Sequence, residues 1–238
     1  MTRAMRVWML VLVILGLGVP DAYALPTLRL TDFGGDGVLG TGDDTVVTVA
    51  DTNAFPDVNN VTGAVTYVGA VGLNWLVNIS TGLTKPVLGS GVIPSLDLLS
   101  VNVSSGAGTL LLEWSDTGFG PPPSVDFLAN IGGTILAGGS LTYKSFADPG
   151  NTLFAQTTLL TSLGPFGGGA FSGSTPSGGM SLAFPYSLTE VVTITHVRAG
   201  ATSFDGELIL APEPSALLLL GTGMVALGLL RLRPRKNK

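Results

Sequence analysis

The chain has 238 residues, with 34 glycines, 15 prolines, no cysteine and a single histidine. Seven of its 11 basic residues lie before residue 25 or after residue 210, whereas 14 of its 16 acidic residues lie between those points. Residues 25–210 therefore carry a net charge of 4 − 14 = −10. This balance argues against nucleic-acid binding, which needs a basic surface. The lack of cysteine excludes disulfides and thiolate metal sites.

The first 24 residues have the layout of a secretory signal peptide. Two arginines precede an apolar run over residues 7–19, which is short for a membrane span. Ala22 and Ala24 then supply the small residues of an A-x-A cleavage site. We expect the secretion machinery to export the chain and a signal peptidase to remove residues 1–24, so that the mature protein begins at Leu25.

Residues 25–210 have the composition and patterning of strands separated by turns. Gly, Ser, Thr and Val are abundant and Lys and Glu are scarce, which disfavours long surface helices. Residues 73–80, 109–114 and 191–198 alternate with period two, as strands with one buried face do. Further strand-like runs cover 45–50, 61–68, 96–103, 125–131, 134–143, 152–160, 180–188 and 204–210.

Gly, Pro, Asn and Asp clusters separate these runs, and the glycine-rich residues 164–179 are predicted to form a long flexible loop. About ten short strands with regular turn signals indicate an all-β fold. We predict one antiparallel β-sandwich, jelly-roll-like, over residues 25–210.

Four aspartates crowd the glycine-rich segment ahead of the run 45–50: Asp32, Asp36, Asp43 and Asp44. Calcium prefers carboxylate and carbonyl oxygens on a flexible loop. Residues 40–46 also follow the G-x-G-x-D-x-U pattern of calcium-binding β-roll repeats. The pattern occurs once, whereas a β-roll site needs stacked turns. Calcium is thus the one cofactor that the sequence suggests, and plain Asp-Gly turns are the alternative.

Few residues suit catalysis, and we assign no catalytic residue. His196 shares a strand face with Val192 and Ile194, which predicts a partly buried structural histidine. No G-x-S-x-G motif is present. The acids that glycoside hydrolysis would need are interpreted as solvated surface residues. They are Glu113 with Asp116, and Glu190 with Asp205 and Glu207.

Two further features bear on glycans. Asn-x-Ser/Thr sequons, which can carry N-glycans, occur at Asn60, Asn78 and Asn102, the last two within predicted strands. A carbohydrate-binding sandwich would stack sugars on exposed aromatic side chains. The candidates are Trp75, Trp114, Tyr67, Tyr143 and Tyr186, although both tryptophans alternate with polar residues as core positions do.

Residues 211–238 combine three parts. Pro212, Glu213 and Pro214 favour an extended strip, because proline cannot join a helix interior. Residues 216–230 are apolar and uncharged, and as a helix they would span about 22 Å, less than the roughly 30 Å of a bilayer core. A basic tail, 231–238, ends the chain and stays on the cytoplasmic side by the positive-inside rule. Its membrane-stop residues include Arg231, Arg233, Arg235 and Lys236.

The motif, the apolar helix and the basic end, in that order, resemble the PEP-CTERM sorting signal of Gram-negative bacteria. The resemblance implies that an exosortase, a transpeptidase-like membrane enzyme, recognises Pro212-Glu213-Pro214 and removes the tail. It also implies a transient stay in the inner membrane, followed by delivery to the cell surface or to an extracellular matrix with exopolysaccharide. We therefore expect a non-enzymatic exported protein. A carbohydrate-binding module is the first alternative and a secreted hydrolase the second.

Overall fold

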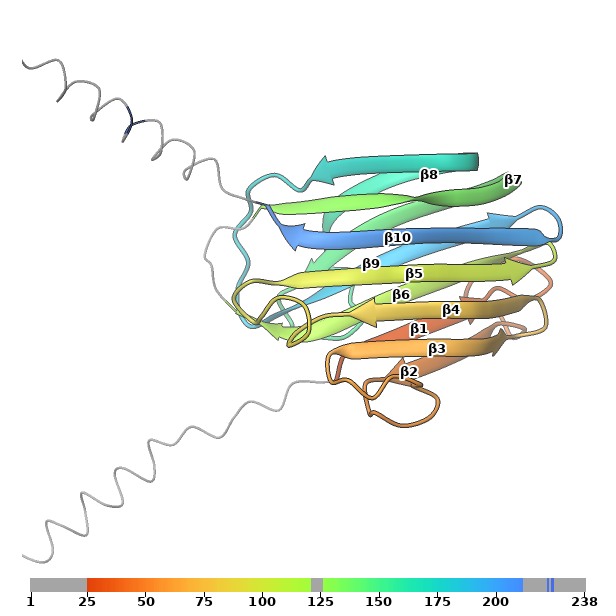
Figure 1. Ribbon diagram of the computed structural model, residues 1–238, viewed down its shortest axis with the longest axis horizontal. Coiled ribbons are helices and arrows are strands. Elements are labelled where there is room, and N and C mark those ends of the chain that lie inside the picture. The colour runs from red at the N-terminus through yellow and green to blue at the C-terminus, as the bar shows by residue number, and fades with distance from the viewer. Residues whose placement is uncertain (1–24, 121–125, 212–221, 223, 225–238) are drawn as a thin grey trace, which may run out of the picture.

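The computed structural model describes residues 25–120, 126–211, 222 and 224 (Figure 1). Strands dominate this part of the chain, and within it no helix has the length and apolar character needed to cross a membrane. The ten strands are β1 Thr27–Asp32, β2 Thr45–Ala50, β3 Ala64–Val71, β4 Trp75–Leu83, β5 Ser95–Ser105, β6 Gly108–Phe119, β7 Phe127–Asp148, β8 Thr158–Pro176, β9 Tyr186–His196 and β10 Gly200–Leu210.

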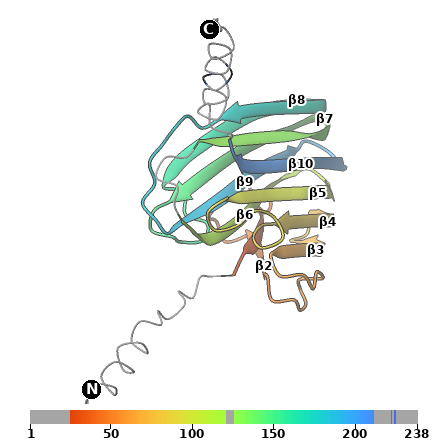
Figure 2. The ribbon, with the colours of Figure 1, turned by 60° about the vertical axis from the view of Figure 1, so that its left-hand side comes forward.

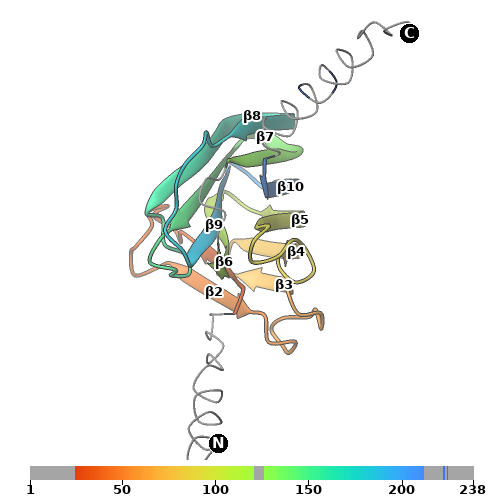
Figure 3. The same ribbon diagram turned by 90° about the vertical axis from the view of Figure 1, so that its left-hand side faces the viewer.

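The strands form two facing layers, all of whose pairings are antiparallel. The hydrogen-bonded order is β2-β1-β6-β9-β7-β10-β5-β4-β3, and β8 pairs with β7. β7 pairs with β10 through residues 127–134 and with β9 through residues 140–148. β7 and β8 therefore join layer I (β2, β1, β6, β9) to layer II (β10, β5, β4, β3) along one side (Figures 2 and 3). The all-β antiparallel sandwich that the sequence predicts is confirmed.

The core lies between the layers because alternate residues of each strand point inward. Trp114 of layer I is fully buried, and a Cβ built on Gly82 of layer II would lie 2.5 Å from its ring. The Trp114 ring thus occupies the space that a side chain at position 82 would need. Trp75 is also buried, at 2% exposure, so the core positions predicted for both tryptophans are confirmed.

β1 begins and β10 ends at the same end of the sandwich, which we call the terminal end (Figure 1). The antiparallel order places the loops 51–63, 84–94, 149–157 and 177–185 there as well. We call the opposite end the far end. Its loops include 33–44, 72–74, 106–107 and 197–199.

The prediction of a flexible loop over residues 164–179 is wrong. β8 runs through most of this segment and pairs with β7 as far as the Leu128–Pro176 pair. Phe166 and Phe171 stack with their ring centroids 4.7 Å apart and pack against the core. The neighbouring strand and this aromatic pair supply the order that the glycine-rich sequence does not indicate by itself.

Candidate functional site

A groove crosses the outer face of layer II, over β5, β10 and β7. Its floor is Gly132, directly opposite Asp205 in the strand register, where a missing side chain leaves room. Two adjoining cavities of about 270 and 310 Å³ share these two residues and make up the groove. We call it the β10 groove. Its lining residues are Asp97, Leu99, Val101, Asn102, Asn130, Ile131, Gly132, Gly133, Ser203, Phe204, Asp205, Gly206 and Glu207.

One wall of the groove is a row of polar side chains from adjacent strands. Asp97, Glu207, Asn130 and Ser174 lie opposite one another across β5, β10, β7 and β8. Asn130 Nδ2 donates to Glu207 Oε1 at 2.8 Å, and Ser174 Oγ donates to Asn130 Oδ1 at 2.6 Å. These bonds hold the carboxylate and amide groups in fixed positions along the wall.

The other wall is uncharged. Asn102, Ser203 and Thr134 lie opposite one another on β5, β10 and β7. The Ser203 and Thr134 hydroxyls are 3.3 Å apart, and Asn78 Nδ2 donates to Asn102 Oδ1 at 2.7 Å. Amide and hydroxyl groups can both donate and accept hydrogen bonds, so this wall complements the acceptor-rich wall across the floor.

The groove has an anionic character. Burial raises the pKa of Asp97 to about 6, and the charges of Glu207 and Asp205 act in the same direction. None of the described residues that line it is basic. Phosphate and sulfate groups would therefore be repelled, whereas neutral hydroxyl donors can be bound by the carboxylate, amide and hydroxyl groups.

A buried acid lies in the core beneath the groove. A Cβ built on Gly206 would be 3.4 Å from Tyr143 Cε2, and the Tyr143 hydroxyl donates to Glu190 Oε1 at 2.7 Å. Glu190 is fully buried, and its Oε2 has no hydrogen-bond partner. Burial, reinforced by Asp97 and Glu207, holds the pKa of Glu190 well above its ordinary value. The interpretation of Glu190 as a solvated surface acid is therefore wrong.

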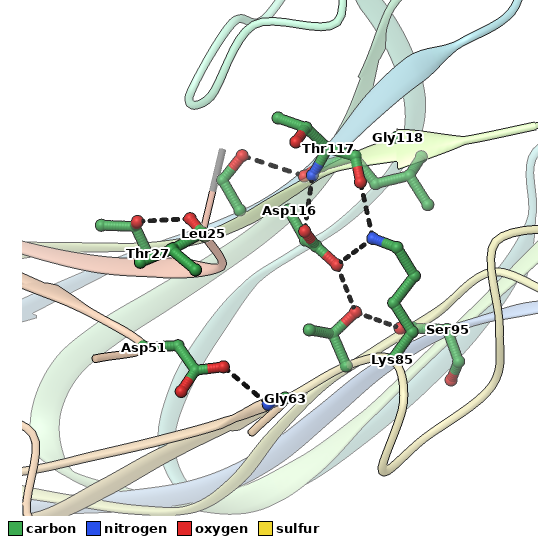
Figure 4. A network of polar contacts seen from close by, with 12 residues as sticks. Leu25, Thr27, Asp51, Gly63, Lys85, Ser95, Asp116, Thr117 and Gly118 are labelled. Carbon is green, nitrogen blue, oxygen red and sulfur yellow. Dashed lines mark hydrogen bonds and ion pairs between the residues drawn. The ribbon is translucent and has the colours of Figure 1, made fainter. Parts of the chain in front are cut away.

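A second polar cluster lies at the terminal end (Figure 4). Lys85 Nζ is 2.5 Å from both Asp116 Oδ2 and the Thr117 carbonyl oxygen, and 4.1 Å from the centroid of the Phe119 ring. Thr84 Oγ1 donates to the same Asp116 oxygen at 2.9 Å. Burial raises the pKa of Asp116, although Lys85 acts against that shift.

This cluster forms the floor of a cavity of about 410 Å³. The cavity walls come from the start of β1 and from the loop 84–94, through Pro26, Pro86, Gly89, Ser90 and Gly91. Lys85 Nζ is engaged by Asp116, by the Thr117 carbonyl oxygen and by the Phe119 ring. These contacts join the start of the loop 84–94 to β6, so the cluster anchors that loop.

Glu113 and Asp116 do not form a catalytic pair, and their interpretation as solvated acids is wrong. Each is only 1% exposed. Asp116 points into the sandwich, whereas Glu113 lies on the outer face of layer I, paired with Arg29 at 2.5 Å and bonded to Gln156. Sequence patterning missed both ion pairs because each partner is supplied by a distant part of the chain.

The four aspartates of the predicted calcium loop are bound by donors of their own loop. Asp43 accepts from Gly35 N and Thr41 Oγ1, both at 2.7 Å, and these contacts, Thr41 first, lower its pKa. Asp44 accepts from Gly40 N, Asp36 from Val38 N, and Asp32 from Gly34 N. Across the described residues, no three acidic, histidine or cysteine side chains are grouped as a metal site requires. The structure thus does not assemble a metal site from these residues, and calcium binding stays a prediction.

The remaining predicted residues fall into three groups. His196 is 2% exposed, bonded to Ser105 and Thr202 and stacked on Trp75, so its structural role is confirmed. The sequons lie on exposed Asn60 and Asn78 and on half-buried Asn102, and their glycosylation stays a prediction. The aromatic residues proposed to stack sugars are all buried: Trp75, Trp114, Tyr67, Tyr143 and Tyr186.

The targeting residues lie outside the described part of the chain. They are Ala22 and Ala24 of the cleavage site, Pro212, Glu213 and Pro214 of the sorting motif, and Arg231, Arg233, Arg235 and Lys236 of the membrane stop. Ala211 is the last residue described before the motif, and its amide donates to the Asp126 carbonyl oxygen at 2.7 Å. This hydrogen bond fixes the backbone at the residue that precedes Pro212.

No family model and no curated protein matches the chain. Among solved structures, TmCBM61 in complex with β-1,4-galactotriose is similar at 12% identity, with a TM-score of 0.33, over 58% of this chain and 88% of that one. The enzymatically active domain of bacteriophage CBA120 tailspike protein 4 is similar at 11% identity and a TM-score of 0.32, over 67% of this chain and 21% of that one. An Arthrobacter globiformis T6 isomalto-dextranase complexed with panose is similar at 14% identity and a TM-score of 0.27, over 82% of this chain and 30% of that one.

Proposed function

We propose that this protein is a non-enzymatic, exported binding protein that holds a neutral polyhydroxylated polymer, a glycan, in the β10 groove. The observation that carries the proposal is the arrangement of two polar walls across a glycine floor. Ligand sites are concave and carry a few precisely placed polar groups. Here Asp97, Glu207 and Asn130 face Asn102 and Ser203 across Gly132.

Recognition in this groove rests on hydrogen bonds rather than on stacking. The five aromatic residues that the sequence offers for stacking are buried, and the groove walls are amides, carboxylates and hydroxyls. Each neutral hydrogen bond contributes about 0.5–1.5 kcal/mol net. We therefore expect one bound sugar residue to be held weakly and a polymer to be held through several contacts along the groove.

A substitution that fills the groove floor tests this proposal. A Cβ built on Gly132 would make only ordinary contacts, the nearest at 3.6 Å to the Phe171 carbonyl oxygen, so Gly132→Val should fold normally. We expect it to lower affinity for the recognised polysaccharide at least about tenfold, because it occupies space between the walls. Gly167→Val is the matched control, since Gly167 is exposed and a Cβ there meets nothing within 4 Å.

The binding assay would use a panel of neutral polysaccharides and the exopolysaccharide of the native host. Lack of binding to every polymer, or binding that Gly132→Val leaves unchanged while the fold is intact, would refute the groove as the binding site. Equal losses in both variants would indicate a general effect of valine on the sandwich.

Glycoside hydrolysis is the second candidate function. Asp97, with its pKa raised to about 6, lies directly opposite Glu207 in the strand register. A protonated carboxyl group beside a second carboxylate is the arrangement that many glycosidases use. Release of reducing ends from a bound polysaccharide, abolished by Asp97→Asn while binding persists, would favour the enzyme. Binding without release favours the binding protein.

The same proposal includes sorting by an exosortase that recognises Pro212-Glu213-Pro214. It is supported by the order of motif, apolar segment and basic end in the sequence. The intact mass of the protein from the outer-surface or secreted fraction of its native host tests it. A mass that ends near Pro214 supports processing, and any additional mass would reveal a glycan or another attachment. A chain that ends at Lys238 in the membrane fraction contradicts it.

A further inference from the structure

The loops of the terminal end expose large apolar side chains. Phe55, on the loop 51–63, is 89% exposed, and Ile93 and Phe184, on the loops 84–94 and 177–185, are each 59% exposed. The same end also exposes Leu25, Val58, Val61, Val87 and Val92. The far-end loops expose a smaller set, Val38, Leu39, Leu73 and Val197, and the two phenylalanines among the exposed large apolar residues of the described chain, Phe55 and Phe184, both lie at the terminal end.

The same loops present little charge to solvent. Asp51 and Asp57 are each 3% exposed, Lys85 is paired with Asp116, and half-buried Asp126 accepts a hydrogen bond from Ser177. Among the described residues, the charged side chains that are exposed lie elsewhere, at Asp36, Asp43, Lys144, Arg198 and Asp205. The terminal end thus differs from the far end, whose loop 33–44 exposes two aspartates.

These loops are held in place from within, so the apolar side chains cannot easily turn inward. The Lys85–Asp116 pair anchors the loop 84–94, and Ser90 N donates to the Ile93 carbonyl oxygen at 2.8 Å. In the loop 51–63, Asp57 Oδ1 accepts from Asn59 N and from Thr66 N, both at 2.9 Å. The conformations of these two loops therefore keep Phe55 and Ile93 exposed to solvent.

The sequence places a membrane segment immediately beyond this end. Four residues, 212–215, separate Ala211 from the apolar run 216–230. Even fully extended, the five Cα–Cα steps from Ala211 to Ala216 span only about 18 Å. If the run enters the bilayer, the terminal end must lie within that distance of the lipid headgroups, with its apolar and uncharged loops directed toward them.

We infer that the terminal end is a lipid-docking surface, on which Phe55, Ile93 and Phe184 enter the headgroup region while the protein awaits processing. The inference rests on the proposed membrane anchoring by residues 216–230. Apolar side chains at an interface bind in proportion to the apolar area they bury. Docking would hold the sorting motif at the membrane surface, where a membrane-embedded enzyme can reach it.

Site-specific labelling of the full chain tests this inference, because the protein has no cysteine of its own. Phe55→Cys, Ile93→Cys and Phe184→Cys place a fluorophore at the terminal end. Leu73→Cys and Val197→Cys are matched controls on far-end loops, where the native side chains are 102% and 60% exposed. Each labelled chain is reconstituted in vesicles of phosphatidylethanolamine with a minor share of phosphatidylglycerol, and lipid-borne nitroxides serve as quenchers.

We expect the terminal-end labels to lose about half of their fluorescence or more, and the far-end labels to change little, because only docked side chains reach the quenchers. If the chain floats with the vesicles but all labels respond alike, docking is refuted and anchoring stands. Terminal-end labels shielded from a water-soluble quencher but not reached by the lipid quencher would indicate a second copy of the chain and also refute docking. A chain that does not float refutes both anchoring and docking.

Discussion

Removal of the Lys85 ammonium group is expected to destabilise the protein by about 3 kcal/mol, because it leaves Asp116 buried without its ion-pair partner. Lys85→Met keeps the apolar stem of the side chain. Breaking a buried pair typically costs about 3–5 kcal/mol. The lower part of that range applies here because 20% of the Lys85 side chain is exposed, and because Thr84 and Thr117 still donate to Asp116.

The cost should depend on pH in a definite direction. Burial raises the pKa of Asp116 in the folded protein. A group whose pKa is higher in the folded than in the unfolded state adds to the free energy of unfolding in full at a pH below its pKa in the unfolded state. That contribution is lost as the pH rises through its pKa in the folded state. Loss of Lys85 raises the folded pKa further. The destabilisation should therefore be largest at neutral pH and should shrink as the pH falls toward about 4, where Asp116 is protonated.

Urea unfolding followed by tryptophan fluorescence measures this effect, since Trp75 and Trp114 are both buried in the core. The control is the double variant Lys85→Met/Asp116→Leu, which removes the unpaired charge and should recover about 2 kcal/mol or more of the loss. A loss below about 1 kcal/mol for Lys85→Met, or a loss independent of pH, would show that Asp116 is not held as a desolvated charge.

Three further substitutions have defined outcomes. Glu190→Gln should stabilise the protein at pH 8 and leave its stability unchanged near pH 4. The raised pKa of Glu190 means that the folded state resists ionisation of this group while the unfolded state does not, so the wild-type protein loses stability as the pH rises and the variant does not. Urea midpoints at the two pH values check this. Asp97→Asn should abolish any change in glycan affinity between pH 5 and 7, as measured by calorimetry, because the pKa of Asp97 is about 6. Gly82→Ala should cost about 1–3 kcal/mol, since its Cβ would overlap the Trp114 ring, whereas Gly167→Ala should stay within about 0.5 kcal/mol in the same thermal unfolding assay.

Period-two patterning was sufficient to predict the sandwich and much of its core. The run 45–50 coincides with β2, and β4, β5, β6 and β9 cover most of their predicted runs. The sequence does not predict β1 because its six residues, TLRLTD, include only two apolar ones, Leu28 and Leu30, whereas the equally long β2, TVVTVA, has four. Patterning also split β7 in two, since Gly132 and Gly133 look like a turn in the sequence but pair with β10 in the structure.

The candidate site could not be predicted from the sequence, because its residues come together only through strand order. Asp97, Asn130 and Glu207 are far apart in the chain, and β10 brings them into one row by pairing with both β5 and β7. Burial of Glu190 follows from its position on the inner face of β9, where Tyr143 of the neighbouring strand reaches it. Glu190 shares the strand face of Val192 and Ile194, so the alternation is consistent with its inward position. The contact with Tyr143 comes from another part of the chain and has no sign in the sequence.

The two proposals are geometrically compatible. The strands run between the far end and the terminal end (Figure 1). The β10 groove crosses β5, β10 and β7 on the outer face of layer II. If the terminal end rests on the lipid surface, the groove lies parallel to the membrane and opens sideways into solvent. A long polymer could then occupy it without meeting the bilayer. Release of the tail would free the terminal end while leaving the groove unchanged, so glycan affinity should be the same before and after processing.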